Sequence, residues 1–236
     1  MNSEPSTLLD KIEQSKQIIA KALSEYPRTA VACSFGKDSM VVVSLARQIK
    51  PDISVFAIMT PMKPSETFEF KDQVVKKWNL NLTVFMSDQE PIEGLWISDP
   101  DRCCQIFKVE PTLRAIKNLD AWITGLRRTE GRTRTDFEPF EVCNGTMKVN
   151  PILDWTETDI WRYTAIFDVP VNPAYRQGYR SLGCAPCTKL VSDEETERAG
   201  RWQGTSKCGG ECGIHTMHKK TDSGKTEPRS EIWVTG

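Results

Sequence analysis

Histidine, long apolar runs and an excess of charge of one sign are all scarce in this sequence. Its 236 residues contain only two histidines, His215 and His218. A histidine-rich metal site is therefore excluded, and a serine hydrolase triad nearly so, because both depend on imidazole side chains. No run of about 18 apolar residues follows the polar start at residues 1–7, which argues against a membrane span and a signal peptide. We therefore expect a cytoplasmic protein with no membrane partner.

Net charge is close to zero, because 31 basic residues are balanced by 32 acidic ones. A surface that binds nucleic acid as a whole needs a clear positive excess, so we expect no nucleic-acid partner. The length suits one α/β domain with a large core, or such a domain followed by a tail. We expect this α/β domain at residues 1–195. A flexible segment would follow at 196–236, partly disordered after residue 215.

Cysteine, in contrast, is abundant, and four of the eight cysteines form two pairs. Cys103 and Cys104 are adjacent, and Cys184 and Cys187 form a Cys-x-x-Cys motif. Thiols stay free in a reducing compartment, and four thiolates complete the ligand shell of Zn²⁺ or of an iron–sulfur cluster. The side chains of neighbouring residues in an extended chain point to opposite sides. Two adjacent cysteines can therefore bind one metal ion only if their backbone is helical or turned. A cluster relaxes this condition, because each cysteine can bind a separate iron atom. The pattern favours a [4Fe–4S] cluster over a zinc ion, disulfides or ordinary buried thiols.

A candidate phosphate loop lies near the start of the chain. Apolar spacing predicts a helix over residues 8–25, and the apolar run at 29–33 predicts a buried strand. Another helix is expected at 40–47. A small-residue loop between strand and helix aims backbone N–H groups at an anion, although a tight turn without a ligand is the alternative. The candidate phosphate ligands are Ser34, Phe35, Gly36, Lys37, Asp38 and Ser39.

The segments that follow predict an α/β fold with a twisted parallel sheet flanked by helices. Strands are expected at residues 53–59 and 82–86, with a helix at 65–78 between them. This order forms right-handed crossovers, and the ligands of such sheets bind beyond the carboxyl ends of the strands. Ser34 and Thr60 both fall at such an end, although Thr60 also suits a plain turn.

Two later stretches carry further candidates. A helix is expected at residues 108–117, a strand end at 122–125, and a loop with four arginines at 126–135. That loop is either a solvated surface or, because it follows a strand, a source of guanidinium groups for the bound anion. Thr156 and Asp159 have capping-box-like spacing at the start of another helix.

Cys212 stands apart from the two cysteine pairs, in a glycine-rich segment. Glycines make such a segment mobile, and a thiolate beside cations is a good nucleophile. A separate metal or disulfide pair of Cys208 with Cys212 is the alternative. The cations available to Cys212 are Arg198, Arg201 and His215.

Residues 34–39 resemble the pyrophosphate loop of the adenine-nucleotide α-hydrolase superfamily, usually Ser-Gly-Gly-Lys-Asp-Ser, with Phe35 in place of one glycine. The chain as a whole is similar to the sulfonucleotide reductases, the family of adenylylsulfate (APS) and phosphoadenylylsulfate (PAPS) reductases. The motifs that carry this resemblance span residues 30–215 and are highly specific in combination. They are Cys103-Cys104, Lys108-x-x-Pro111, Gly125-x-Arg-Arg128, Trp155-Thr-x-x-Asp159, Asn172-Pro173, Gly183-Cys-x-Pro-Cys-Thr188, Glu197-Arg-x-Gly-Arg-Trp202 and Glu211-Cys-Gly-Ile-His215.

The resemblance implies a pyrophosphate-loop fold and the thioredoxin-dependent reduction of APS to sulfite and AMP in sulfate assimilation. Cys212 would attack the sulfur and carry an S-sulfonate, which a reduced thioredoxin or glutaredoxin resolves. In this family the two cysteine pairs mark the branch that holds a [4Fe–4S] cluster and prefers APS. Lys108 would lie between the cluster and the substrate. The other implied substrate ligands are Arg128, Arg134, Arg198, Arg201 and His215. The resemblance does not decide whether the chain forms a homo-oligomer.

The sequence also departs from the family pattern. Met59 stands where the family has an aspartate, Phe107 stands where it has an arginine, and residues 37–39 are closer to ATP-using relatives. Three alternatives therefore remain. They are the same reaction on PAPS, an ATP-dependent sulfurtransferase acting on nucleic acid, and a zinc-stabilised binding module that is not an enzyme. The near-zero net charge and the buried α/β pattern disfavour the last.

Overall fold

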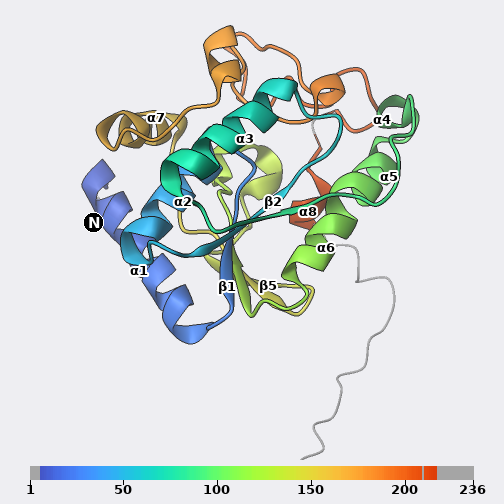
Figure 1. Cartoon of the computed structure of the whole chain (residues 1–236). Helices are drawn as coiled ribbons and strands as arrows, with labels where there is room; N and C mark the ends of the chain where they lie inside the picture. The colour runs from blue at the N-terminus through green and yellow to red at the C-terminus, as the bar shows by residue number, and fades with distance from the viewer. Residues whose placement is uncertain (1–5, 209, 217–236) are drawn as a thin grey trace, which may run out of the picture.

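The computed structural model describes residues 6–208 and 210–216. A sheet forms its centre (Figure 1). It has six strands, in the order β3-β2-β1-β4-β6-β5. Neighbouring strands pair in parallel, except that β5 and β6 are antiparallel. The predicted α/β class with a parallel sheet is therefore confirmed. The strands are β1 (Thr29–Ala32), β2 (Ser54–Ile58), β3 (Leu82–Phe85), β4 (Ala121–Ile123), β5 (Phe140–Cys143) and β6 (Thr146–Val149).

Helices cover both faces of the sheet (Figure 1). On one face lie α1 (Leu8–Glu25), α2 (Lys37–Ile49), α3 (Ser65–Trp78) and α7 (Glu157–Ile166). On the other lies α6 (Glu110–Ile116), preceded by α4 (Leu95–Ser98), α5 (Pro100–Cys104) and the π-helical turn η1 (Gln105–Val109). Short 3₁₀ turns and α8 (Gly213–Thr216) complete the described part, in which no helix is long and apolar enough to cross a membrane. The disorder expected after residue 215 concerns residues that, except for Thr216, lie outside the described ones.

The side chains of the central strands point alternately to the two faces of the sheet, so the hydrophobic core has two layers. Successive side chains of a strand point to opposite faces of its sheet. Toward the helices α1, α2, α3 and α7, the central strands contribute Val31, Val55 and Ile123. Toward α6, they contribute Ala30, Phe56 and Trp122. The apolar runs that predicted these strands therefore reflect burial on both faces.

The helix starts follow their sequence signals. The hydroxyl of Thr156 accepts a hydrogen bond from the Asp159 N–H at 3.2 Å, and the Asp159 carboxylate accepts one from the Thr156 N–H at 2.8 Å. This is the predicted capping box, and Thr7 and Asp10 form another at the start of α1. Each box satisfies backbone donors that a helix leaves unpaired at its first turn.

The strand order reverses beside β1, and this reversal positions the site. Strand β1 pairs with β2 on one side and with β4 on the other. In doubly wound sheets, ligands bind at the carboxyl ends of the strands that flank such a reversal. The loop at residues 34–39 follows β1 and the loop at 124–127 follows β4, so both lie at this edge.

Phe35 occupies the loop after β1 in an unusual backbone conformation. Its φ angle is 61°, in the left-handed region that favours glycine, while its buried ring meets the Phe70 ring edge-on with 6.4 Å between centroids. Such strain costs about 1–3 kcal/mol, less than the roughly 3–5 kcal/mol lost when a buried phenylalanine is truncated.

We expect Phe35→Gly to lower the free energy of unfolding by about 2–3 kcal/mol. Phe35→Ala should lower it by about 1 kcal/mol more than Phe35→Gly does, because alanine keeps the backbone strain. Urea denaturation measures both, and equal losses would argue against strain at this position.

Candidate active site

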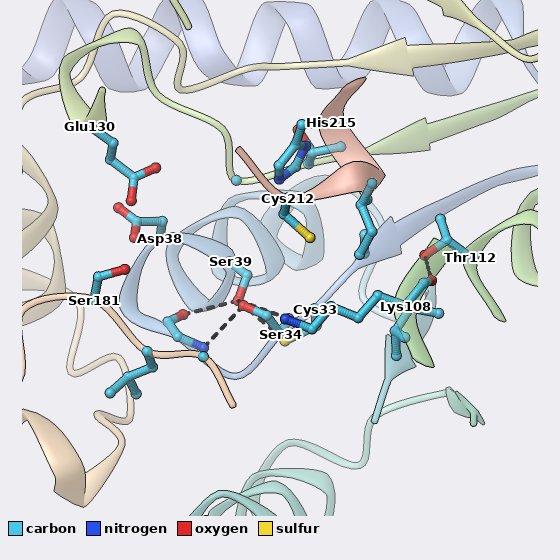
Figure 2. Close-up of a pocket in the computed structure, with 18 of the residues that line it drawn as sticks. Cys33, Ser34, Asp38, Ser39, Lys108, Thr112, Glu130, Ser181, Cys212 and His215 are labelled. Atoms are coloured by element: carbon cyan, nitrogen blue, oxygen red, sulfur yellow. Dashed lines mark hydrogen bonds between the residues drawn. The ribbon is translucent and has the colours of Figure 1, made fainter. Parts of the chain in front are cut away.

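A cavity of about 200 Å³ opens at the carboxyl ends of β1, β2 and β4. Segments far apart in the sequence form its walls (Figure 2). The sequence-predicted residues that line it are Ser34, Gly36, Asp38, Ser39, Lys108, Arg134, Arg198, Arg201, Cys212 and His215. The predicted residues that do not line it are Phe35, Lys37, Thr60 and Arg128.

The loop after β1 is held by its own hydroxyl groups. The Ser39 hydroxyl accepts a hydrogen bond from the Ser34 N–H at 3.2 Å and donates to the Gly36 carbonyl at 3.0 Å (Figure 2). Gly125, just after β4, passes so close that a Cβ atom there would lie 2.8 Å from the Ser39 nitrogen. The loop and the end of β4 therefore form one continuous wall of the cavity.

Lys37 turns away from the cavity into a buried ionic network. Its amine lies 2.8 Å from the Glu197 carboxylate and donates to the Arg180 carbonyl at 2.7 Å. Burial lowers the pKa of Lys37, but the carboxylates of Asp38 and Glu197 outweigh it and the pKa is raised. The charge of Lys37, which was predicted to bind phosphate, instead ties the loop to Glu197 inside the protein.

The arginine loop after β4 joins the same network. Arg127 is fully buried, and its guanidinium donates to Asp38 at 2.6 Å and to Glu197 at 2.7 Å. Arg128 instead pairs with Asp154 toward solvent. Neither guanidinium lines the cavity.

Two arginines that do line the cavity also have an acidic partner. The Glu211 carboxylate accepts a hydrogen bond from Arg134 at 2.6 Å and another from Arg198 at 2.8 Å. Burial raises the pKa of Glu211, but Arg134 and Arg198 outweigh it and hold the pKa below its usual range. An anion that reaches these arginines must share them with Glu211.

Three further cations lining the cavity, Lys63, Lys108 and Arg201, have no acidic partner among the described residues; we call them the open cation group. The Lys63 amine donates to the Ser34 carbonyl at 3.0 Å. The Arg201 guanidinium donates to a backbone carbonyl at 3.1 Å, and its buried Nε has no partner in the part of the chain described. Burial and the charge of Lys108 lower the pKa of Lys63 to about 8, although the Cys184 sulfur opposes them. These cations offer the cavity a positive charge that no carboxylate of the described residues neutralises.

Cys212 presents its sulfur to the cavity, which the Lys108 side chain enters from a different segment (Figure 2). A hydrogen bond with the Cys104 thiol and the charge of Lys108 hold the pKa of Cys212 below its usual range, although burial opposes them. Burial and the charge of Arg134 lower the pKa of His215 well below its usual value, which disfavours its protonated form. His215, one of the cations predicted beside Cys212, lines the same cavity.

The two cysteine pairs come together beside this cavity. A hollow of about 10 Å³ has all four thiols in its wall, along with Met62 and Trp96. The thiols are those of Cys103, Cys104, Cys184 and Cys187, and all four residues are buried. The adjacent cysteines end helix α5, so their backbone is helical, which is the conformation in which both could also reach a single ion.

The donor chemistry of this hollow fits an iron–sulfur cluster. Four thiolates are the usual protein ligands of such clusters. No three His, Cys, Asp or Glu side chains at residues 6–208 and 210–216 are placed to hold a single metal ion. The Thr60 hydroxyl lies 3.3 Å from the Cys184 sulfur, and the Trp202 indole packs among the thiols.

Lys108 lines both the open cavity and the hollow that the four cysteines surround. It projects from η1, a π-helical turn of the kind often found at functional sites. Burial lowers the pKa of Lys108, but the nearby sulfurs of Cys184 and Cys212 outweigh it and the pKa is raised. The structure thus places a protonated amine between the cysteine hollow and the open cavity.

Sequence reasoning missed Lys63 and Thr124, which also line the cavity. Both follow the carboxyl end of a strand, β2 or β4, where ligands of parallel sheets bind. That rule was available from the predicted strands alone. The same rule points to Ser34 and Thr60.

Gly183 leaves room for the Arg201 guanidinium. A Cβ atom on Gly183 would lie 2.4 Å from the Arg201 Cζ, so alanine must displace this flexible group. We expect Gly183→Ala to change the free energy of unfolding by less than about 1 kcal/mol and to weaken binding of the anionic ligand about tenfold. Thermal unfolding and calorimetric titration would measure the two effects. Arg201→Ala is the reference, and full affinity in Gly183→Ala beside a loss in Arg201→Ala would contradict this role of Gly183.

Comparison with known proteins points to one family. Residues 28–190 match the model of the phosphoadenosine phosphosulfate reductase domain. A curated relative, the adenosine 5'-phosphosulfate reductase of Staphylococcus epidermidis, is 36% identical over 221 residues, which cover 89% of this chain and 90% of the relative.

Solved structures agree in fold. The phosphoadenylyl-sulfate reductase of Candida auris, solved as a phosphate complex, superposes with a TM-score of 0.66 at 20% identity, covering 81% of this chain and 99% of that one. The FMN adenylyltransferase of Candida glabrata gives a TM-score of 0.61 at 16% identity, covering 83% and 71% of the two chains. At these identities the likeness concerns the fold, and it confirms the pyrophosphate-loop architecture predicted from residues 34–39.

Proposed function

We propose, from the premise that this chain belongs to the phosphoadenosine phosphosulfate reductase domain family, that it reduces adenylylsulfate to sulfite and AMP with electrons from a dithiol protein. The observation that carries the proposal is the position of Cys212. Its sulfur enters a cavity at the nucleotide-binding edge of the sheet, which the open cation group also lines. Curated relatives named adenosine 5'-phosphosulfate reductase, 33% to 37% identical, support APS as the substrate.

The first chemical step joins Cys212 to the sulfate sulfur. The Cys212 thiolate attacks that sulfur, a sulfur–sulfur bond forms, and the bond from sulfur to the AMP oxygen breaks with its electron pair going to AMP. The enzyme then carries an S-sulfonate on Cys212. Lys108 and Arg201, which line the cavity, would neutralise the sulfate oxygens during the attack.

The remaining candidate ligands would hold the nucleotide. We assign the phosphate to the loop after β1, through Ser34, Gly36 and Ser39. Arg134 and Arg198 would add positive charge around the nucleotide phosphate, which would share these two arginines with Glu211. His215, in its neutral form, would contribute a hydrogen bond. The placements of Lys37, Thr60 and Arg128 support indirect roles, because their side chains do not line the cavity.

A thiol donor completes the cycle. One thiolate of reduced thioredoxin or glutaredoxin attacks the Cys212 sulfur, and sulfite leaves with the electron pair of the sulfur–sulfur bond. The second donor thiol resolves the mixed disulfide, so the donor is oxidised to a disulfide as sulfate is reduced to sulfite. Such a donor works in a reducing compartment, which supports a cytoplasmic reaction. The donor must reach Cys212, so we propose that the segment starting at residue 196 moves to expose it.

We assign a [4Fe–4S] cluster to Cys103, Cys104, Cys184 and Cys187. When bound, it would fix the architecture of the site and shape the field at the sulfate, because the donor thiols supply both electrons. A thiol that binds iron is deprotonated, so Cys104 would no longer donate to Cys212. The charge of Lys108 would remain as the influence that favours the Cys212 thiolate.

Anaerobic purification followed by iron and sulfide analysis and an assay on APS tests the proposal. We expect sulfite and AMP in equal amounts when reduced thioredoxin or glutaredoxin is present, and little activity without it. A clear preference for PAPS would change the substrate. Cleavage of ATP to AMP and pyrophosphate without a sulfonucleotide would favour the sulfurtransferase alternative. A cluster-loaded protein inactive on APS and PAPS would overturn the proposal.

A further inference from the structure

Lys63 lines the cavity but belongs to none of the motifs that predict the site. It sits in a turn after β2, where its backbone N–H donates to the Thr60 carbonyl at 3.0 Å. The turn fixes Lys63 at the ligand-binding edge of the sheet. Its amine donates to the Ser34 carbonyl at 3.0 Å. Because an ammonium group has three donors, this single bond leaves N–H groups for a ligand.

The charges around Lys63 favour an anion. Among the described residues, none of Lys63, Lys108 and Arg201 has a carboxylate partner, whereas the other cavity arginines bind Glu211. Partly buried positive charges without a carboxylate partner are unfavourable, and a bound anion adds to the partial compensation that the Cys184 sulfur gives Lys63 and Lys108. The partnerless Nε of Arg201 points to the same conclusion, because buried donors in folded proteins almost always have an acceptor.

We propose that Lys63 binds the non-bridging oxygens of the substrate sulfate, together with Lys108 and Arg201, and so orients the sulfur toward Cys212. The inference rests on the proposed function and adds a binding residue that the family motifs do not include. It assigns the open cation group to the sulfate, and Arg134, Arg198 and the loop after β1 to the rest of the nucleotide. AMP lacks the sulfate, so Lys63 distinguishes the substrate from the product.

Binding of APS and of AMP to cluster-loaded Lys63→Met tests this assignment. Methionine keeps the length of the side chain and removes its charge. A Cys212→Ser background prevents turnover, so isothermal titration calorimetry gives true dissociation constants. We expect the Kd of APS to rise about 10- to 100-fold, as expected for lost charge-assisted hydrogen bonds, and that of AMP to change by less than about threefold. Lys63→Arg keeps the charge and should recover most of the APS affinity.

Lys76→Met is the matched control, because Lys76 is an exposed lysine on α3. It should leave both dissociation constants unchanged. Equal weakening of APS and AMP by Lys63→Met, or an unchanged affinity for APS, would overturn the role of Lys63. With Cys212 present, Lys63→Met should raise the KM for APS more than it lowers kcat. A wild-type protein that binds APS without reducing it overturns the proposed function alone, whereas one that does not bind APS overturns both.

Discussion

Cys212→Ser is expected to lower kcat for APS reduction by at least about 10⁴-fold, because a serine hydroxyl is rarely ionised and attacks sulfur poorly. The iron content and the AMP affinity should stay at wild-type levels. Cys212 lines the open cavity but not the cysteine hollow, and it lies outside α5 and the turn that carries Cys187. The substitution therefore removes the nucleophile and leaves the proposed ligands in place. Sulfite release, iron analysis and calorimetric titration with AMP measure the three quantities.

Mass spectrometry gives an independent readout of the same residue. Wild-type protein incubated with APS and no donor should gain the mass of one sulfonate, and Cys212→Ser should gain none. Cys208→Ser is the control, because Cys208 is the exposed cysteine nearest in sequence to Cys212. It should keep the sulfonate, the iron and the activity. Iron loss in Cys212→Ser would instead mean that Cys212 is a ligand and that the assignment of thiols is wrong.

The central strands β1 and β2 were predictable because they are buried on both faces, whereas the partly exposed edge strand β3 was predicted from its apolar run alone. Strands β1, β2 and β3 lie within a residue or two of the apolar runs at 29–33, 53–59 and 82–86. Helix α2 begins at Lys37, earlier than the predicted residue 40, because Gly36 provides its N-terminal cap position. The motif combination identified the family, and the comparisons confirm both that family and an oxidoreductase that acts on sulfur.

The hairpin of β5 and β6 was not predicted, although its turn carries a signal. Asn144 and Gly145 have φ angles of 50° and 76°, the left-handed pair typical of a two-residue hairpin turn. Its strands mix polar and apolar residues, because Lys148 pairs with Glu141 across the hairpin at 2.7 Å. Mixed strands at the edge of a sheet leave no apolar run for a pattern to detect.

The partners of the charged candidates could not be read from the sequence either. The residue types and the predicted strand ends indicated that Lys37 and the arginine loop lie near the site, and in the structure they do. Which cation meets a carboxylate depends on Glu197 and Glu211, which come from a segment far along the chain. That long-range pairing separates the neutralised cations from the open cation group, and no local pattern encodes it.

Cys187→Ser is expected to reduce the iron content from about four atoms per chain to near zero, because a serine oxygen is a poor replacement for a thiolate ligand. The cluster would link α5 to the turn at Ala185–Cys187, two segments far apart in sequence. Loss of that link should lower the free energy of unfolding by about 3 kcal/mol, or the melting temperature by roughly 6–12 °C. Anaerobic iron and sulfide analysis and thermal unfolding measure these effects. Cys143→Ala, at a buried cysteine outside the hollow, should keep its iron. Full iron content in Cys187→Ser, or an iron-free wild-type protein that is active under strict exclusion of oxygen, would refute the cluster assignment.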